Sequence, residues 1–182
     1  RNTATATINL LSVNDAPDGT DSTVTTLEDT EYILTAADFG FTDIEGHNLQ
    51  SVTISSLPAI GNLTNDGVDV VAGQSISIAD INAGLLVYTP VPDNNGTAVA
   101  SFTFQVCDDG GLANGGVDKD GTPNTMTIDI TPVADITDDT ATTAEDTAVI
   151  TTVLANDSFD GTPVVTAVTQ GANGIVTINV DN

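Results

Sequence analysis

The chain has 182 residues and is strongly acidic, with 26 aspartates and glutamates against 2 lysines and arginines, a formal net charge of −24 at pH 7. This charge makes nucleic acid and anionic membrane surfaces poor partners and makes cations favourable ones. Its 40% hydrophobic content is too high for a disordered chain, its single cysteine excludes an intrachain disulfide, and no apolar run approaches the about 20 residues of a transmembrane helix.

The N-terminal stretch, residues 2–17, predicts the closing strand and linker of a preceding repeat, because it resembles residues 124–135 further along the chain. Short helical turns are expected at TAADFG (35–40) and at IADINAG (78–84). Ser77 or Asp80 would cap the second of these turns. The helical content of the chain is therefore expected to be small.

Short segments rich in Thr, Val and Ile alternate with clusters of Gly, Asn, Asp and Pro, which is typical of a many-stranded antiparallel protein. NDG at 65–67 predicts a hairpin, since Asp and Gly tolerate positive φ. Core strands are expected at SISI (75–78), SFTFQVC (101–107) and TMTIDI (125–130), where apolar residues alternate with polar ones. The predicted fold class is all-β, a Greek-key β-sandwich.

The chain contains an internal repeat, because TTLEDTEYIL (25–34) is similar in sequence to TTAEDTAVIT (142–151). Glu145 minus Glu28 gives 117 residues, a period that suits one whole β-sandwich in tandem. DIEG (43–46) similarly aligns with SFDG (158–161). The chain is therefore predicted to have three parts: residues 1–16 close a preceding repeat, 17–133 form a complete sandwich, and 134–182 are the first part of a following, truncated repeat.

Acidic residues cluster where the strands are expected to end. In a Greek-key sandwich the B–C and F–G loops lie at the same pole as the N-terminal linker. Ca²⁺ takes six to eight oxygen ligands at about 2.3 to 2.6 Å, and alternate residues of an extended loop point the same way. We therefore expect a calcium site at this pole, built from Asn14, Asp15, Asp43, Glu45, Asp108 and Asp109.

A second calcium site is expected at the opposite pole, where the first sandwich joins the next repeat. By the same count of strands, the loop between the first two strands lies there, together with the second linker and the corresponding loops of the second copy. The predicted ligands of this site are Glu28, Asp29, Asp135, Asp157 and Asp160.

Simpler interpretations exist for these residues. Asp side chains in turns often satisfy loop amides without a metal ion. The lone His47 is assigned no role, because an isolated histidine in a polar loop is more often a surface residue than a ligand. Paired carboxylates also occur in glycosidases, but an acidic chain always offers some pairs and no aromatic cleft is visible, so no enzymatic activity is expected.

Six sequence motifs together resemble those of a known family: EDT, ADFGFTDIEG, LPAIGNLT, GLLVYTPVPDNNGT, SFTFQVCDDGG and TPVAD. They are similar to the tandem cadherin-like, Ig-like repeats of large RTX-type bacterial surface adhesins. The resemblance implies type I secretion, an extracellular location, a role in adhesion and biofilms, and spacer modules whose partners are calcium and neighbouring repeats. The second linker, PVAD, departs from the NDAP of the first.

A ligand-binding module that recognises a glycan or a protein directly is the alternative function. Such sites usually need an aromatic platform. The chain has no tryptophan and only 4% aromatic residues. A spacer that projects a distal binding domain is therefore the favoured hypothesis.

Overall fold

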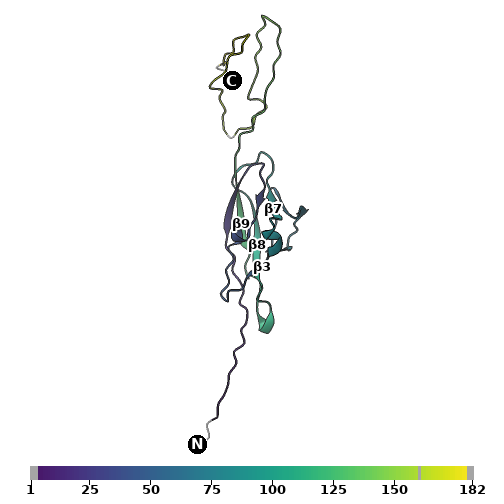
Figure 1. Ribbon diagram of the computed structural model, residues 1–182, viewed down its shortest axis with the longest axis vertical. Helices are drawn as coiled ribbons and strands as arrows, with labels where there is room; N and C mark the ends of the chain where they lie inside the picture. Colours follow the sequence, from purple (N-terminus) through teal and green to yellow (C-terminus); the bar gives the residue numbers. More distant parts are fainter. Residues whose placement is uncertain (1–3, 160, 180–182) are drawn as a thin grey trace. The chain divides into compact units, whose positions relative to one another are not determined.

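The computed structural model describes residues 4–159 and 161–179 of the chain. It divides into two compact units, one up to Thr131 and one from Pro132 onward. The first unit is a β-sandwich of two sheets, so the predicted all-β sandwich fold is confirmed (Figure 1). Each unit is described by itself below.

The larger sheet is built around one long strand, β8, which lies between β9 and β3 (Figure 1). The pairing of β1 with β9 is parallel, whereas the other pairs are antiparallel. In order across the sheet the strands are β1 (Ser22–Leu27), β9 (Asn124–Thr131), β8 (Gly96–Asp108), β3 (Leu49–Ile54) and β6 (Ser75–Ser77).

The smaller sheet consists of short strands, all paired antiparallel. Its hairpin between β4 and β5 turns at Asp66 and Gly67, whose φ angles are 51° and 72°, as expected for the NDG motif. In order across the sheet the strands are β2 (Tyr32–Ile33), β7 (Leu86–Thr89), β4 (Asn62–Asn65) and β5 (Val68–Asp69).

The core lies between the sheets and follows the period-two pattern of β8. Phe102, Phe104 and Val106 are buried, while Thr103 and Gln105 between them are half-buried. Phe104 meets the ring of Phe39 edge-on, with ring centroids 4.9 Å apart and an interplanar angle of 78°. Burial of these large rings fixes β8, and β8 in turn fixes the loop that begins at Asp108.

The helical segments are short. The turn expected at TAADFG is the 3-10 helix η1 (Ala36–Phe39), and a further 3-10 turn, η2 (Ala113–Gly115), was not expected. The second expected turn is α1 (Ile78–Asn82), where the Ser77 hydroxyl accepts a 3.1 Å hydrogen bond from the Asp80 amide. The strand predicted over 75–78 therefore ends one residue early, because Ser77 caps a helix.

The remaining parts of the chain form no sheet. Residues 4–17 are extended without strand pairing, and the second unit contains a single described bridge, between Asp135 and Ser158. The closing strand expected at residues 2–17 is therefore not paired over its described part, residues 4–17. A β-strand needs a neighbouring strand to satisfy its backbone amides. No described residue of the second unit is buried.

Candidate metal centre

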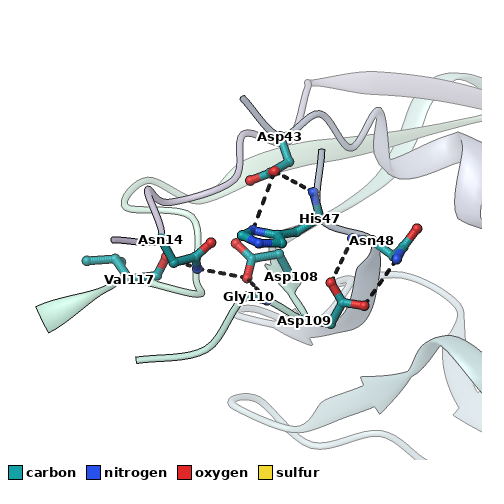
Figure 2. A network of polar contacts seen from close by, with 8 residues as sticks. All are labelled: Asn14, Asp43, His47, Asn48, Asp108, Asp109, Gly110 and Val117. Atoms are coloured by element: carbon teal, nitrogen blue, oxygen red, sulfur yellow. Dashed lines mark hydrogen bonds and ion pairs between the residues drawn. The ribbon is translucent and has the colours of Figure 1, made fainter. Parts of the chain in front are cut away.

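Asn14, Asp43 and Asp108 meet at one end of the sandwich (Figure 2). Asn14 belongs to the N-terminal linker, Asp43 to the loop before β3, and Asp108 to the end of β8. The Asn14 amide nitrogen donates to Asp108 Oδ1 at 2.9 Å and to the Val117 carbonyl at 2.7 Å. These two bonds fix the amide plane and turn Asn14 Oδ1 toward the carboxylates.

The two aspartates are held by backbone amides of their own loops. Asp43 Oδ1 accepts a 2.7 Å hydrogen bond from the His47 amide, which closes the turn at Gly46. Asp108 Oδ1 accepts a 2.8 Å bond from the Gly110 amide. In each carboxylate, Oδ1 therefore accepts a hydrogen bond from the loop, and Oδ2 is left over without a hydrogen-bond partner.

The left-over atoms are buried and have no hydrogen-bond partner: Asn14 Oδ1, Asp43 Oδ2, Asp108 Oδ2 and, in addition, His47 Nδ1. Asn14 is 7% exposed, Asp108 is 1% exposed, and the Asp43 side chain is 1% exposed. Ligand atoms of Asp43, His47 and Asp108 lie within 4.8 Å of one another.

Buried unpaired carboxylate oxygens are costly, and two of them side by side repel each other. A divalent cation would remove both costs, since it neutralises the carboxylates and gives every left-over oxygen a partner. The donor set of carboxylates and an amide oxygen fits a hard cation such as Ca²⁺. These residues therefore fit the predicted ion.

Gly110 keeps the centre open. A Cβ atom built on this glycine would collide with Asn14 Oδ1 and with His47 Nδ1. Any larger residue would thus fill the space between the left-over atoms. The role of Gly110 and the position of His47 are features that sequence analysis missed. The only sequence signal for His47 was its place four residues after Asp43.

Asp109 lies beside the centre but is turned away from it. The Asn48 backbone amide donates to Asp109 Oδ1 at 2.8 Å, and the Asn48 side-chain amide donates to Oδ2 at 3.1 Å. These hydrogen bonds, aided by the nearby His47, lower the pKa of the exposed Asp109 carboxyl below its usual value. Asp109 joins the loop after β8 to the segment before β3 (Figure 2).

The other residues predicted for this site lie at its margin. Asp15 lines a shallow hollow together with Asp18, Thr42 and Asp43. Glu45 is exposed, and its carboxylate is not among the ligand atoms that cluster with Asp43 and Asp108. The structure thus gathers part of the predicted ligand set.

Within each unit, the described residues among those predicted for a second site do not form a comparable centre. Glu28 lies beside the start of β8, where the Asn95 side chain donates to its Oε2 at 2.9 Å, and the Glu28 amide donates to the Thr131 carbonyl. Asp29 is a turn residue with φ 59°. Asp157 accepts from the Thr137 amide at 2.7 Å, and Asp160 lies outside the described residues. A second calcium site, with Asp135, stays a prediction.

A family model described as a bacterial Ig domain matches residues 14–131, well over half of the chain. The chain belongs to this family. The match begins at Asn14 and ends with the last residue of β9, so it covers the sandwich and all the residues of the centre. Comparison with curated proteins found no match. No helix among the described residues is long and apolar enough to cross a membrane.

Bacterial Ig domains are structural modules, typical of repeats in surface proteins.

The second unit reproduces one detail of the Ig domain. Asp18 and Thr42 exchange two backbone hydrogen bonds of 2.9 Å, and Asp135 and Ser158 exchange two bonds of 3.0 and 2.9 Å. Ser158 thus corresponds to Thr42. The alignment of DIEG with SFDG was therefore one residue out of register.

With this register Phe159 takes the place of Asp43, since each directly follows the bridge residue. The hollow that Asp15, Asp18 and Asp43 line in the Ig domain corresponds to one lined by Pro132, Val133, Ala134, Phe159, Gly161, Thr162 and Pro163. Apolar residues thus replace the acidic ones. Among the described residues of the second unit, this hollow is therefore apolar where that of the Ig domain is acidic.

Proposed function

We propose that this Ig domain is a calcium-stiffened spacer repeat of a secreted bacterial surface adhesin. The observation that carries the proposal is the convergence of left-over oxygens from Asn14, Asp43 and Asp108, all of them buried. One of these residues belongs to the linker and the other two belong to the sandwich. An ion bound by all of them therefore ties the linker to the domain.

The stiffening follows from the contacts of Asn14. Its backbone carbonyl accepts a 2.9 Å bond from the Val117 amide and its side chain binds Asp108, so the linker already touches the loop after β8. A calcium ion bound by the Asn14 side-chain oxygen and by the carboxylates of Asp43 and Asp108 would link the linker to both loops. The linker then loses rotational freedom at the point where a preceding repeat would be joined.

The finer assignment rests on the resemblance of the quoted motifs to RTX-type adhesins. It gives the repeat an extracellular location after type I secretion, neighbouring repeats as partners, and an indirect role in adhesion and biofilms. Extracellular calcium modules bind weakly, with dissociation constants of about 10⁻⁴ to 10⁻³ M. A site of that affinity responds to calcium outside the cell.

The use of the aromatic residues argues against a direct glycan-binding site in the Ig domain. Every aromatic side chain between residues 14 and 131 is buried in the core or packs against it: Tyr32, Phe39, Phe41, Tyr88, Phe102 and Phe104. No flat aromatic surface is left for sugar rings. A structural role, without enzymatic activity, is the function these residues support.

The test is the thermal stability of residues 1–182 in excess EDTA and in millimolar calcium. In about 10 mM calcium, which is about 10 to 100 times the Kd range given above, a ligand that binds only the folded state adds about 1.4 to 2.7 kcal/mol to its stability. We expect the Tm to rise by several degrees in calcium. Asp43→Asn should abolish most of this rise, while Glu45→Gln, which removes the same charge from an exposed neighbour, should keep it.

Equal melting curves with and without calcium would contradict the proposal. The same holds if Asp43→Asn and Glu45→Gln respond alike, because the effect would then come from general charge screening. Isothermal titration calorimetry on the unmodified chain gives an independent measure of binding.

A further inference from the structure

The centre contains a nitrogen donor that an all-oxygen calcium site does not need. His47 Nδ1 is one of the buried atoms without a hydrogen-bond partner, although the side chain as a whole is 33% exposed. The ring therefore turns this particular atom inward. Figure 2 shows the imidazole lying between Asp43 and Asp108.

The position of Nδ1 is not explained by a hydrogen bond. Its nearest carboxylate oxygen, Asp43 Oδ1, is 3.7 Å away and already accepts from the His47 backbone amide. Nδ1 thus faces the left-over carboxylate oxygens without a hydrogen bond to any of them. A metal ion held between Nδ1 and those oxygens would give each of these atoms a partner.

The donor set decides which ion suits the centre. Together the left-over atoms are one imidazole nitrogen, two carboxylate oxygens and one amide oxygen, from His47, Asp43, Asp108 and Asn14. Zinc is usually four-coordinate and binds His nitrogen and carboxylate oxygen at about 2.0 to 2.2 Å. Imidazole favours zinc and related transition ions, whereas calcium prefers oxygen alone.

The spacing allows a small ion. The ligand atoms of Asp43, His47 and Asp108 lie within 4.8 Å of one another. In a tetrahedral zinc site with bonds of about 2.0 to 2.2 Å, neighbouring ligand atoms are about 3.3 to 3.6 Å apart, so the side chains would close in around zinc by up to about 1.5 Å. Gly110 leaves that space free, since a Cβ there would touch His47 Nδ1.

We infer that His47 Nδ1 is a metal ligand and that the centre binds zinc in preference to calcium. The inference rests on the centre of the proposed function and ranks zinc above the calcium that is proposed to bind there. In the chain, His47 is the only histidine and Cys107 the only cysteine, so the thiol of Cys107 is the only other side-chain ligand of the nitrogen or sulfur type that zinc prefers. Cys107 Sγ is directed to Thr53 Oγ1, at 3.8 Å, outside the cluster.

The experiment is calorimetric titration of residues 1–182 with ZnCl₂, MnCl₂ and CaCl₂ separately. Zinc is expected to bind more tightly than manganese or calcium. Loss of an outer-shell partner costs about 10- to 100-fold in metal affinity, and we expect His47→Ala, which removes a ligand, to weaken zinc binding by at least this much, with calcium affinity changed less than about threefold. His47→Asp, which supplies oxygen instead of nitrogen, should reverse the preference toward calcium. Cys107→Ser is the control and should bind zinc unchanged.

The nuclear magnetic resonance signal of the single imidazole reports ligation directly, because zinc binding shifts Nδ1 whether or not stability changes. Zinc affinity that is equal in the wild type and His47→Ala overturns the inference, and so does an unchanged imidazole signal. If calcium stabilises the chain and zinc does not bind, the inference fails while the proposed function stands. If zinc binds through His47 and calcium has no effect, the inference stands and the calcium proposal fails.

Discussion

Gly110 is the residue whose substitution most directly tests whether the centre holds an ion. Gly110→Ala places a methyl group against Asn14 Oδ1 and His47 Nδ1, while the Gly110 amide still donates to Asp108. The methyl group displaces these two atoms, so we expect some loss of stability in EDTA and, in the folded protein, a fall in metal affinity of about tenfold or more, as for other residues that support metal ligands. Calorimetry and thermal melts measure both.

Gly121→Ala is the matched control, because nothing lies within 4 Å of a Cβ at that position. It should bind metal like the wild type. If Gly110→Ala also binds like the wild type, the ion does not occupy the space between these side chains.

The two tyrosines predict how stability responds to alkali. Burial raises the pKa of Tyr88. The pKa of Tyr32 is also raised, by burial and by the negative charge of Asp38, whose carboxylate accepts a hydrogen bond from the Tyr32 hydroxyl. A raised pKa means that the unfolded chain loses its protons first. The contribution to stability is thus complete below pH 10 and is lost as the pH rises through the folded pKa values.

Absorbance at 295 nm follows this titration without interference, because the chain has two tyrosines and no tryptophan. In EDTA, tyrosinate should form above the usual pKa of about 10, together with a fall in the urea midpoint. Tyr32→Phe should leave the single late transition of Tyr88. A normal titration of Tyr88 in the folded protein would contradict its burial in the core.

The residues of the centre were predictable only in part. Asn14, Asp43 and Asp108 follow from counting strands, because the fold brings their loops to one end. The inward turn of His47 does not follow, since it depends on the turn at Gly46 and on the bonds between Asn48 and Asp109. Such local geometry is absent from the strand pattern.

Among the elements, the short helix α1 depends on its cap. The Ser77 hydroxyl satisfies the Asp80 amide, and this helix places Ile81 in the core. Ser77→Ala should lower the free energy of unfolding by about 1 kcal/mol, the usual cost of an N-cap. Urea unfolding measures the loss. Ser77→Thr, which keeps a hydroxyl, should cost less, and equal losses in the two variants would mean that the cap contributes nothing.

Strands with a clear period of two were predicted well, because their alternating residues match a half-buried sheet. β8 and β9 are examples. The two-residue strand β2 and the parallel pairing of β1 with β9 were not anticipated. They depend on neighbours far away in the chain, which a local pattern does not contain. The end of β6 at Ser77 shows the same limit, since a capping residue also fits a strand.

At the scale of the whole molecule, the two units differ in how their apolar residues are used. The Ig domain buries a continuous core. In the second unit Ile150 and Ile175 are 76% and 89% exposed, and no described residue is buried. Ordering a residue costs about 1 to 2 kcal/mol of backbone entropy, which only burial and paired hydrogen bonds offset. Local opening of the second unit should therefore cost little free energy.

Hydrogen exchange on the intact chain tests this difference. Amides of β8, β9 and β3 should exchange slowest, because their opening requires global unfolding, whereas those between Asp138 and Ile178 should exchange quickly. Metal should slow exchange at Val117, whose amide donates to Asn14, and leave Ser158 unaffected, because Phe159 replaces the acidic ligand there. Equal protection in both units would mean that the second unit has a core of its own. Equal slowing at Val117 and Ser158 would place an ion in both copies and overturn the register that aligns Phe159 with Asp43.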